Sequence, residues 1–292
     1  MDGVELRQLR CLVAVVDEGS FTDAAIALGV SQAAASRTVQ ALERALGVRL
    51  LHRTSRVVHP TAAGVRVLAR ARVLLRGVDE LVAEAAGGQA RLRVGHAWSA
   101  FGARTAEFLR RWRAAHPEVE LDLVRHNSPT AGLAEGRCDL AVVRAEVDRD
   151  RWAHALVGYE DRVLAVATDD PWARRRSVGL AEVAGRTVAV DRRTGTTTLR
   201  LWQADRRPAT EDTADVDDWL AAIATGRCVG VTPRATAAQY RRDGITYRPL
   251  RGAPPVPVHL IWRPGDANAA LHAVAALLVE LYREPTSARP HS

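Results

Sequence analysis

The chain has 292 residues with 47% hydrophobic and 26% charged side chains, a composition typical of a globular protein of about two domains. No apolar run approaches the length of about 18 residues that a membrane-spanning helix needs. Cys11, Cys138 and Cys228 are far apart and form no C-x-x-C pair, which argues against a disulfide framework or a cysteine zinc site. With no apolar signal region at the start, the sequence predicts a cytoplasmic protein with no membrane association, no metal site and no cofactor.

The distribution of charge is more informative than its total. The formal net charge is +7, and all 41 basic residues are arginine, which GC-rich coding explains more readily than function. Residues 31–76 contain nine arginines and a single acid, Glu43, so this segment carries +8 and the rest of the chain about −1. A polyanionic partner is therefore expected to bind this segment.

Apolar spacing predicts three helices at the N-terminal end. Residues 4–17 place leucines and valines at helical steps, and a glycine–serine pair ends that helix. Ser20 or Thr22 is suited to cap a second, short helix that Gly29 ends, and Ser31 is suited to cap a third. Small residues in the second helix, a tight glycine turn and a longer third helix are typical of a helix-turn-helix. We expect the wedge between the second and third helices to be filled by Ala24, Ala25, Leu28, Val39, Leu42 and Leu46.

The third helix presents a polar face without acids. In the major groove, arginine pairs with guanine and glutamine with adenine, while a short serine lets the helix approach the DNA closely. We therefore predict DNA contacts by Ser31, Gln32, Ser36, Arg37 and Gln40. The alternative is an ordinary solvated helix face.

Residues 48–60, VRLLHRTSRVVHP, are rich in valine and arginine and end in a proline, which indicates a β-hairpin, or wing. Such a wing lies along the DNA backbone or enters the minor groove, so its contacts are more positional than sequence-specific. Arg53, Thr54 and Arg56 are the predicted wing contacts. The flanking His52 and His59 have no acidic or cysteine companions and make no metal site.

A long helix is expected to begin after Thr61 as its cap. Apolar residues recur along it at steps of four and three, the a/d pattern of a helix that pairs with another along its length. The predicted dimerisation seam is Val67, Ala71, Leu74, Val78, Leu81 and Ala85. The alternative is a helix packed on its own domain.

From Arg91 onward, short apolar strands alternate with helices, beginning with the strand RLRVG and a helix over SAFGARTAEFLRRWRAAHP. This alternation predicts an α/β domain with a largely parallel sheet. Ser99 follows the first strand at an expected helix N-terminus, and Thr196 and Thr197 hold a similar position further along. Free backbone N–H groups and helix dipoles there would favour a carboxylate, while the alternative is that these hydroxyls are ordinary N-caps.

Residues 5–64 resemble the N-terminal domain of LysR-type transcriptional regulators nearly end to end. The matching stretch is ELRQLRCLVAVVDEGSFTDAAIALGVSQAAASRTVQALERALGVRLLHRTSRVVHPTAAG. It departs from the family where Ala33-Ala34-Ala35 replaces the common Pro-Ala-Leu and where Leu51 replaces a phenylalanine. The linker helix and the alternating second half also fit the family, so the resemblance covers the whole chain.

The resemblance implies an α/β fold class with a winged helix-turn-helix over residues 1–60, a dimerising linker helix over 61–88 and an effector-binding domain over 89–292. That domain is expected to be two-lobed and periplasmic-binding-protein-like, with lobe I at about 91–162 and 266–285 and lobe II at about 163–265. The effector-binding residues that it implies between the lobes are Ser99, Asn127, Ser128, Arg144, Thr196 and Thr197. Implied partners are double-stranded promoter or operator DNA, a small anionic effector, further copies of the chain in a dimer or tetramer, and RNA polymerase.

Two other function classes are weighed against a regulator. The sequence contains no G-x-S-x-G, P-loop, G-x-G-x-x-G or H-E-x-x-H motif, so an enzyme is not predicted. The acid-rich residues 212–218 lack the spacing of a metal loop, and Asp217 is expected to cap the helix that follows. A ligand-independent DNA-architectural protein would have no need of some two hundred residues of α/β domain.

Overall fold

The computed structural model describes residues 3–53, 58–86, 90–266 and 269–284. It divides into two compact units. Unit 1 is Met1–Arg91 with Leu133–Arg137, and unit 2 is Leu92–Gly132 with Cys138–Ser292.

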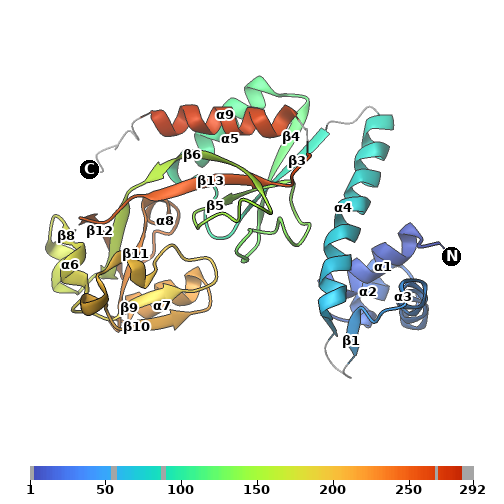
Figure 1. Ribbon diagram of the computed structural model, residues 1–292, viewed down its shortest axis with the longest axis horizontal. Helices are drawn as coiled ribbons and strands as arrows, with labels where there is room; N and C mark the ends of the chain where they lie inside the picture. Colours follow the sequence, from blue (N-terminus) through green and yellow to red (C-terminus); the bar gives the residue numbers. More distant parts are fainter. Residues whose placement is uncertain (1–2, 54–57, 87–89, 267–268, 285–292) are drawn as a thin grey trace. The chain divides into compact units, whose positions relative to one another are not determined.

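Unit 1 contains the predicted helix-turn-helix, wing and long helix (Figure 1). Its described elements are α1 (Leu6–Asp17), α2 (Phe21–Leu28), α3 (Gln32–Leu46), β1 (Leu51–Arg53), β2 (Val58–Pro60) and α4 (Ala62–Ala85).

Local side-chain chemistry fixes where these helices begin and end. The hydroxyl of Ser20 accepts from the backbone N–H of Asp23 at 3.0 Å, and that of Ser31 accepts from Ala34 at 3.1 Å. Gly29 adopts a left-handed conformation with φ of 66°, which ends α2. The predicted caps are therefore confirmed, and the alanines that replace the family's Pro-Ala-Leu leave a regular helix start. At α4, the Thr61 hydroxyl accepts from the N–H of Gly64 at 3.0 Å, also as predicted.

The core of unit 1 lies between α1, α2, α3 and the first half of α4. Its buried residues include Leu12, Ala24, Ala25, Ala35, Val39, Leu42, Leu68 and Ala71. Leu28 and Leu46 were expected in the same wedge, but both are exposed. Each is the last residue of its helix, and therefore lies at the rim of the helix contact.

Unit 2 contains two sheets that define two lobes (Figure 1). In sheet order, lobe I has β4 (Val119–Arg125), β3 (Ala90–His96), β5 (Leu140–Val143), β13 (Val256–Trp262) and β6 (Ala153–Glu160). Lobe II has β10 (Thr210–Thr213), β9 (Val188–Asp191), β11 (Val229–Pro233), β7 (Arg162–Ala167), β12 (Ile245–Arg251) and β8 (Val178–Gly179). The α-helices of unit 2 are α5 (Thr105–Ala115), α6 (Leu180–Val183), α7 (Val216–Ala224), α8 (Arg234–Gln239) and α9 (Ala269–Arg283), and the short 3₁₀ turns are η1 (Gly102–Arg104), η2 (Pro171–Arg174), η3 (Leu199–Leu201) and η4 (Ala204–Arg206).

The prediction of a largely parallel sheet was wrong. Strand β3 runs parallel to β5, and β9 runs parallel to β10 and β11. However, β13 is antiparallel to β5 and β6, and β7 is antiparallel to β11 and β12. Parallel neighbouring strands need a long crossover connection, usually a helix. Only Asp161 separates β6 from β7, so the chain has no such helix at this point. Both sheets are therefore mixed.

The boundary expected for lobe II was also wrong at its C-terminal end. Residues 163–265 were assigned to lobe II, but β13 pairs along its length with β6 of lobe I, from Val256↔Glu160 to Trp262↔Ala153. Lobe II is thus the continuous stretch 162–251, and the chain has returned to lobe I by Val256. An apolar strand carries no local signal for which of two sheets it joins.

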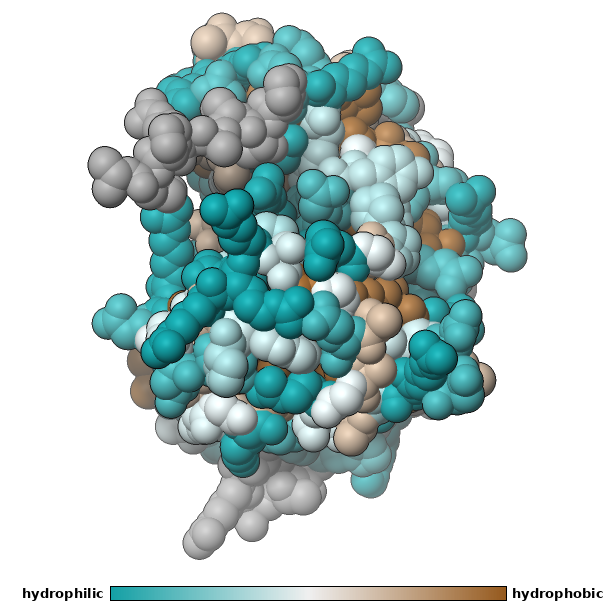
Figure 2. Space-filling view, turned by 90° about the vertical axis from the view of Figure 1, so that its left-hand side faces the viewer, coloured by the Kyte–Doolittle hydropathy of each residue, from teal (hydrophilic) through white to brown (hydrophobic). Residues whose placement is uncertain are grey.

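The two lobes have separate apolar cores. In lobe I, α5 and α9 pack together over the five-stranded sheet and bury Phe101, Phe108, Trp112, Leu260, Val274 and Leu278 (Figure 1). In lobe II, one cluster includes Leu164, Val188 and Val229, and a second includes Trp219, Leu220 and Ile223. The outer face seen in Figure 2 is mostly hydrophilic, with apolar residues in small patches.

Candidate functional site

The acid-free face predicted for α3 is present in unit 1. Ser31, Gln32, Arg37 and Gln40 are exposed, and Ser36 is partly exposed. The neighbouring Thr38 differs from these residues, because its hydroxyl donates its hydrogen to the carbonyl of Ala34 at 2.9 Å within the same helix. The α3 face therefore offers amide and guanidinium donors of the kind that read base edges.

The single acid of the basic segment has a structural task. One carboxylate oxygen of Glu43 accepts from the backbone N–H groups of Leu50 and Leu51, at 2.8 and 3.2 Å. These bonds tie the end of α3 to the first strand of the wing, so the acid fixes the wing and is not presented to a polyanion.

The described part of the wing is an antiparallel pair. Leu51 lies opposite Pro60, His52 opposite His59, and Arg53 opposite Val58. The predicted contacts Thr54 and Arg56 lie outside the described residues.

Helix α4 divides its apolar residues between two faces. Ala71 is only 1% exposed and belongs to the core of unit 1, and Val67 is partly buried against the same core. For Ala71 the predicted seam was therefore wrong, because the own-domain alternative applies to this half of the helix. Further along, Leu74 is 57% and Leu81 is 64% exposed, while Val78 is half-buried and Ala85 exposed. An apolar strip thus remains uncovered on the second half of α4.

Unit 2 contains a cavity between its lobes with a volume of about 350 Å³, here called the interlobe cavity. Lobe I contributes most of its lining, from the segments after β3, β4 and β5, and lobe II contributes Arg193 and Thr194. The cavity brings together Ser99, Ser128 and Arg144, three of the predicted effector-binding residues.

Ser99 is the one hydroxyl of this cavity that has an unmet hydrogen bond among the described residues. Its side chain is buried, at 1% exposure, and no described group forms a hydrogen bond with its Oγ. Buried hydroxyls are nearly always hydrogen-bonded, so this atom indicates a place for a ligand or a solvent molecule. By contrast, the Ser128 Oγ accepts from the N–H of Gly132 at 3.1 Å and closes its own turn.

Arg144 is held in a buried network. Its Nε and Nη2 donate to the two carboxylate oxygens of Glu160, each at 2.9 Å, and it also donates to the carbonyls of Ser99 at 2.8 Å and Ala100 at 2.9 Å. Burial alone would lower the pKa of Arg144, but the charges and hydrogen bonds of Glu160 and Tyr282 together more than offset it and raise the pKa. Arg144 thus donates two hydrogen bonds to Glu160 and two to carbonyls of the Ser99 loop, so its observed role is to position that loop.

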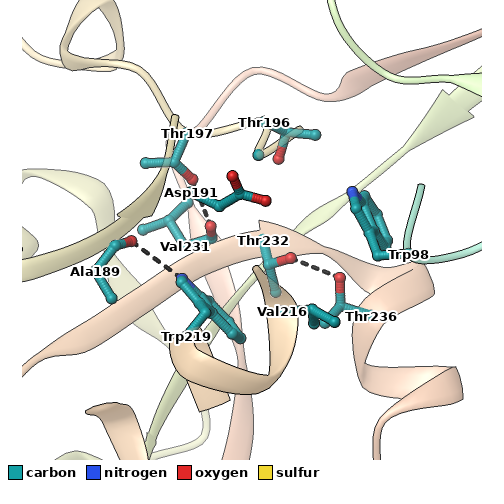
Figure 3. Close-up of a pocket in the computed structure, with 11 residues that line it drawn as sticks. Trp98, Ala189, Asp191, Thr196, Thr197, Val216, Trp219, Val231, Thr232 and Thr236 are labelled. Carbon is teal, nitrogen blue, oxygen red and sulfur yellow. Dashed lines mark hydrogen bonds between the residues drawn. The ribbon is translucent and has the colours of Figure 1, made fainter. Parts of the chain in front are cut away.

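A second cavity, of about 380 Å³, lies mainly in lobe II (Figure 3). We call it the lobe II cavity. It is lined by Trp98, Ala189, Asp191, Gly195, Thr196, Thr197, Val216, Trp219, Val231, Thr232 and Thr236. Trp98 is the lobe I residue of this lining and also lines the interlobe cavity, so the two cavities share it.

The hydroxyls of the lobe II cavity are differently committed. Thr197 donates to the carbonyl of Val231, and Thr232 shares a 2.6 Å hydrogen bond with Thr236 (Figure 3). Thr196 accepts from Nη1 of Arg162 at 3.3 Å. Thr196 and Thr197 therefore both line the lobe II cavity, but Thr196 accepts a hydrogen bond from Arg162 whereas Thr197 donates one to Val231.

The expected pair of helix N-termini was wrong. Ser99 precedes the 3₁₀ turn η1, whose N-cap is Phe101, and the chain after Thr197 forms only the three-residue turn η3. Neither segment carries the aligned dipole of a full helix at the predicted residue. Asp217 was also wrongly expected as a cap, because Asp215 accepts from the backbone N–H of Asp217 at 2.9 Å.

Asn127 connects the lobes and does not line either cavity. Its amide nitrogen lies 3.4 Å from the carbonyl of Ala214, and its oxygen lies 3.2 Å from the Thr194 hydroxyl. That hydroxyl also lies 2.6 Å from Asp191 Oδ2. A single hydrogen serves one acceptor at a time, so the shorter contact to the carboxylate dominates.

Several lining residues were missed from the sequence. Trp98, Asp191 and Trp219 come from three separated segments that only the folded sheets bring together. The sequence offered one usable signal, since Trp98 directly precedes the predicted Ser99. Within the described residues there is no cluster of three metal-ligating His, Cys, Asp or Glu side chains, and none of the helices is long and apolar enough to cross a membrane.

Known proteins match both units of this chain. Residues 6–65 match the bacterial regulatory helix-turn-helix protein family, lysR type, and residues 85–283 match the LysR substrate binding domain. The chain is 32% identical over 311 residues to the small neutral protease regulatory protein of Streptomyces coelicolor, covering 96% of this chain and 95% of that protein. It is 37% identical over 188 residues to the uncharacterized HTH-type transcriptional regulator YnfL of Escherichia coli strain K12, a match that spans 62% of this chain and 63% of that regulator.

A solved structure also resembles this chain along nearly its whole length. Full-length CbnR, in its crystal structure with target DNA, matches with a TM-score of 0.69 at 25% identity, covering 96% of this chain and 100% of that chain. The two family matches account for both the helix-turn-helix of unit 1 and the two lobes of unit 2. The chain therefore belongs to the LysR family of bacterial transcriptional regulators, whose members are DNA-binding proteins and not enzymes.

Proposed function

We propose that this chain regulates transcription by binding promoter DNA as a homo-oligomer, with a small anionic effector bound at the cavities of unit 2. Gln32, Arg37 and Gln40 of α3 read bases in the major groove, with Ser31 and Ser36 at the backbone and the wing along it. Arg53, Thr54 and Arg56 remain the proposed wing contacts. The observation that carries this proposal is the exposed, acid-free face of α3 within a segment of charge +8.

The proposed oligomer contact uses the uncovered strip of α4. Leu74 and Leu81 are apolar and exposed on one side of the helix, and pairing with a second copy removes them from water. Val78 and Ala85 extend the same side. Two paired copies set two α3 helices in successive major grooves, roughly 34 Å apart or a multiple of that spacing.

The proposed ligand is anionic because two arginines, Arg144 and Arg193, line the interlobe cavity and its described lining includes no carboxylate side chain. Burial, together with the charges of Arg125 and Arg144, lowers the pKa of His96 to about 4, so this histidine is neutral beside two cations. The unmet hydroxyl of Ser99 offers a hydrogen bond in the same cavity. Ser128, Thr196 and Thr197 line the cavities as proposed ligand groups, and Asn127 is proposed to join the lobes.

Regulation follows from differential affinity of the effector for two arrangements of the lobes. A change in lobe arrangement alters the spacing of the subunits on DNA and thereby the access of RNA polymerase to the promoter. The chain is proposed to act in the cytoplasm.

The test is selection of genomic DNA. Purified protein is mixed with sheared DNA of the source genome at moderate ionic strength, and the retained fragments are sequenced. We expect a few promoter regions to be enriched over scrambled oligonucleotides of equal length. Equal retention of genomic and scrambled DNA would refute sequence-specific regulation.

A further inference from the structure

Arg162 occupies the place where the chain passes between the lobes. It is the first residue of β7, directly after the connection from β6, and is only 8% exposed. Its Nε donates to the carbonyl of Pro254 at 3.0 Å, and Pro254 belongs to the return connection between β12 and β13. Its Nη1 donates to the hydroxyl of Thr196 at 3.3 Å. One guanidinium therefore joins both inter-lobe connections to a wall of the lobe II cavity.

This buried cation has no carboxylate partner among the described residues. Its hydrogen bonds go to a carbonyl and a hydroxyl, whereas the comparably buried Arg144 is paired with Glu160. Burial lowers the pKa of Arg162 to about 10, with no acid opposing it. A buried charge without a counter-charge is unfavourable, which makes the site receptive to an anion.

The direction of the hydrogen bond to Thr196 determines what that threonine offers. A guanidinium has only donors, so the oxygen of Thr196 accepts and its own hydrogen is available to another acceptor. Thr197 differs, because its hydrogen is committed to the Val231 carbonyl. Thr196 is therefore a hydrogen-bond donor on the cavity wall with a positive charge behind it.

The other residues that line the lobe II cavity restrict the class of ligand that it can bind. Asp191 lines the same cavity, so a second negative charge on the ligand would meet repulsion there. Trp98, Val216 and Trp219 supply apolar surface. These features favour a ligand with one carboxylate and an apolar body.

We propose that Arg162 is a positioning residue that orients and polarises Thr196 to bind the carboxylate of an apolar monocarboxylic acid. Resting on the proposed function, this inference adds the ligand class, its lobe II anchor and a link to the hinge. Because Arg162 also holds Pro254, neutralising its charge changes the free energy of the two connections about which the lobes move.

The experiment uses the full-length protein and a fixed panel of probes. Butyrate, benzoate and phenylacetate are compared with their neutral amides and with the dianion succinate, at ionic strength matched with sodium chloride. Dissociation constants come from the shift of the thermal unfolding midpoint with probe concentration. The variants are R162M, R162K, T196V, the double variant R162M/T196V, and R113M as a matched exposed-arginine control.

We expect at least one monocarboxylate to stabilise the wild-type protein more than its amide and more than succinate. R162M and T196V should each weaken that binding about tenfold, as for loss of a charge-assisted hydrogen bond, while R162K and R113M retain most of it. The double variant should lose no more than either single variant, because Arg162 acts through Thr196. In chloride alone, R162M should be at least as stable as wild type, since it removes an unpaired buried charge.

A merely structural Arg162 would instead lower stability in chloride and leave the relative affinity for acid and amide unchanged. That result, additive losses in the double variant, or absence of any preference for a monocarboxylate would each overturn the inference. The proposed function is judged separately by the enrichment of genomic fragments, so either can fail while the other stands.

Discussion

The indole nitrogen of Trp98 donates to the carbonyl of Thr194 at 3.2 Å, so a side chain from lobe I is fastened to lobe II. The Tyr240 hydroxyl donates to the Trp98 carbonyl at 2.7 Å and secures the same residue from a second point of lobe II. The residue that the two cavities share thus also fastens lobe I to lobe II.

Replacing Trp98 by phenylalanine tests this connection. An aromatic ring is kept but the pyrrole part of the indole and its N–H are lost, so we expect the free energy of unfolding to fall by about 1 kcal/mol for the missing hydrogen bond, with an added contribution from lost volume. Urea denaturation followed by circular dichroism measures it. Trp262→Phe is the matched control, because the indole of Trp262 has no hydrogen bond to a described group. Equal losses in both variants would show that only ring volume matters.

The changes in the free energy of unfolding on replacing Arg144 and Glu160 should be strongly non-additive. R144M leaves the Glu160 carboxylate buried without its partner, and we expect it to lower the free energy of unfolding by about 3–5 kcal/mol. R144M/E160M removes both charges and should recover much of that loss. A double variant as unstable as the sum of the single variants would contradict a coupled pair.

The same pair predicts a dependence on pH. Burial alone would raise the pKa of Glu160, but Arg144 holds it below its ordinary value. A depressed pKa in the folded state gives stability that is present above the unfolded pKa of about 4.3 and is lost as the pH falls through the folded value. We expect the free energy of unfolding to decline below about pH 4.3, and to decline less in R144M/E160M. Denaturant midpoints across the acid range provide the measurement.

Arg37→Ala should reduce discrimination between promoter and random DNA. If Arg37 contacts a base, specific binding weakens by about 1–3 kcal/mol while binding to random DNA changes little. Fluorescence anisotropy on both DNAs, at one salt concentration, separates the two effects. Arg113→Ala, an exposed arginine on α5, controls for net charge. Equal weakening on both DNAs would make Arg37 a phosphate contact.

Charges placed on the uncovered strip of α4 should separate the subunits. L74D/L81D puts two carboxylates where we propose apolar pairing, so sedimentation velocity should show monomers. The helix content of the double variant should be the same as that of the wild-type protein. Val65 is also exposed, but on another side of the same helix, and V65D is expected to keep the oligomer. A dimer that survives L74D/L81D would move the interface elsewhere.

The three thiols should be unreactive in the folded protein. Cys11, Cys138 and Cys228 are all buried, and burial raises the pKa of Cys228 to about 11, with Glu211 adding to the effect. Only thiolates react rapidly with disulfide reagents, so labelling at neutral pH should be slow until denaturant is added. Labelling of any cysteine at the rate of a free peptide thiol would contradict this.

The sequence predicted most of unit 1 because its signals are local. Ser20, Ser31 and Gly29 each act within one helical turn, and their positions set the helix ends. Heptad spacing on α4, by contrast, does not say which neighbour covers a residue. Ala71 fits the seam by spacing alone, yet lies in the core of its own unit.

Unit 2 was predicted less completely because its site depends on long-range pairing. The strand β13 joins lobe I through residues a hundred positions earlier, and no local pattern specifies that. Ser99, Thr196 and Thr197 were predicted from expected helix N-termini and from the family resemblance; they line the cavities, although full helices do not begin there. Arg162 gave no signal, because one arginine among 41 basic residues stands out only after burial is known.

The inserted position of lobe II has a consequence for how the chain is made. Residues 162–251 form a continuous stretch, whereas lobe I needs β13 and α9 from the far end of the sequence to complete its sheet and cover it. During synthesis from the N-terminus, unit 1 is available first and lobe II second, while β3, β5 and β6 wait for a partner. The half-finished sheet of lobe I is therefore the species that a nascent-chain chaperone would need to shield.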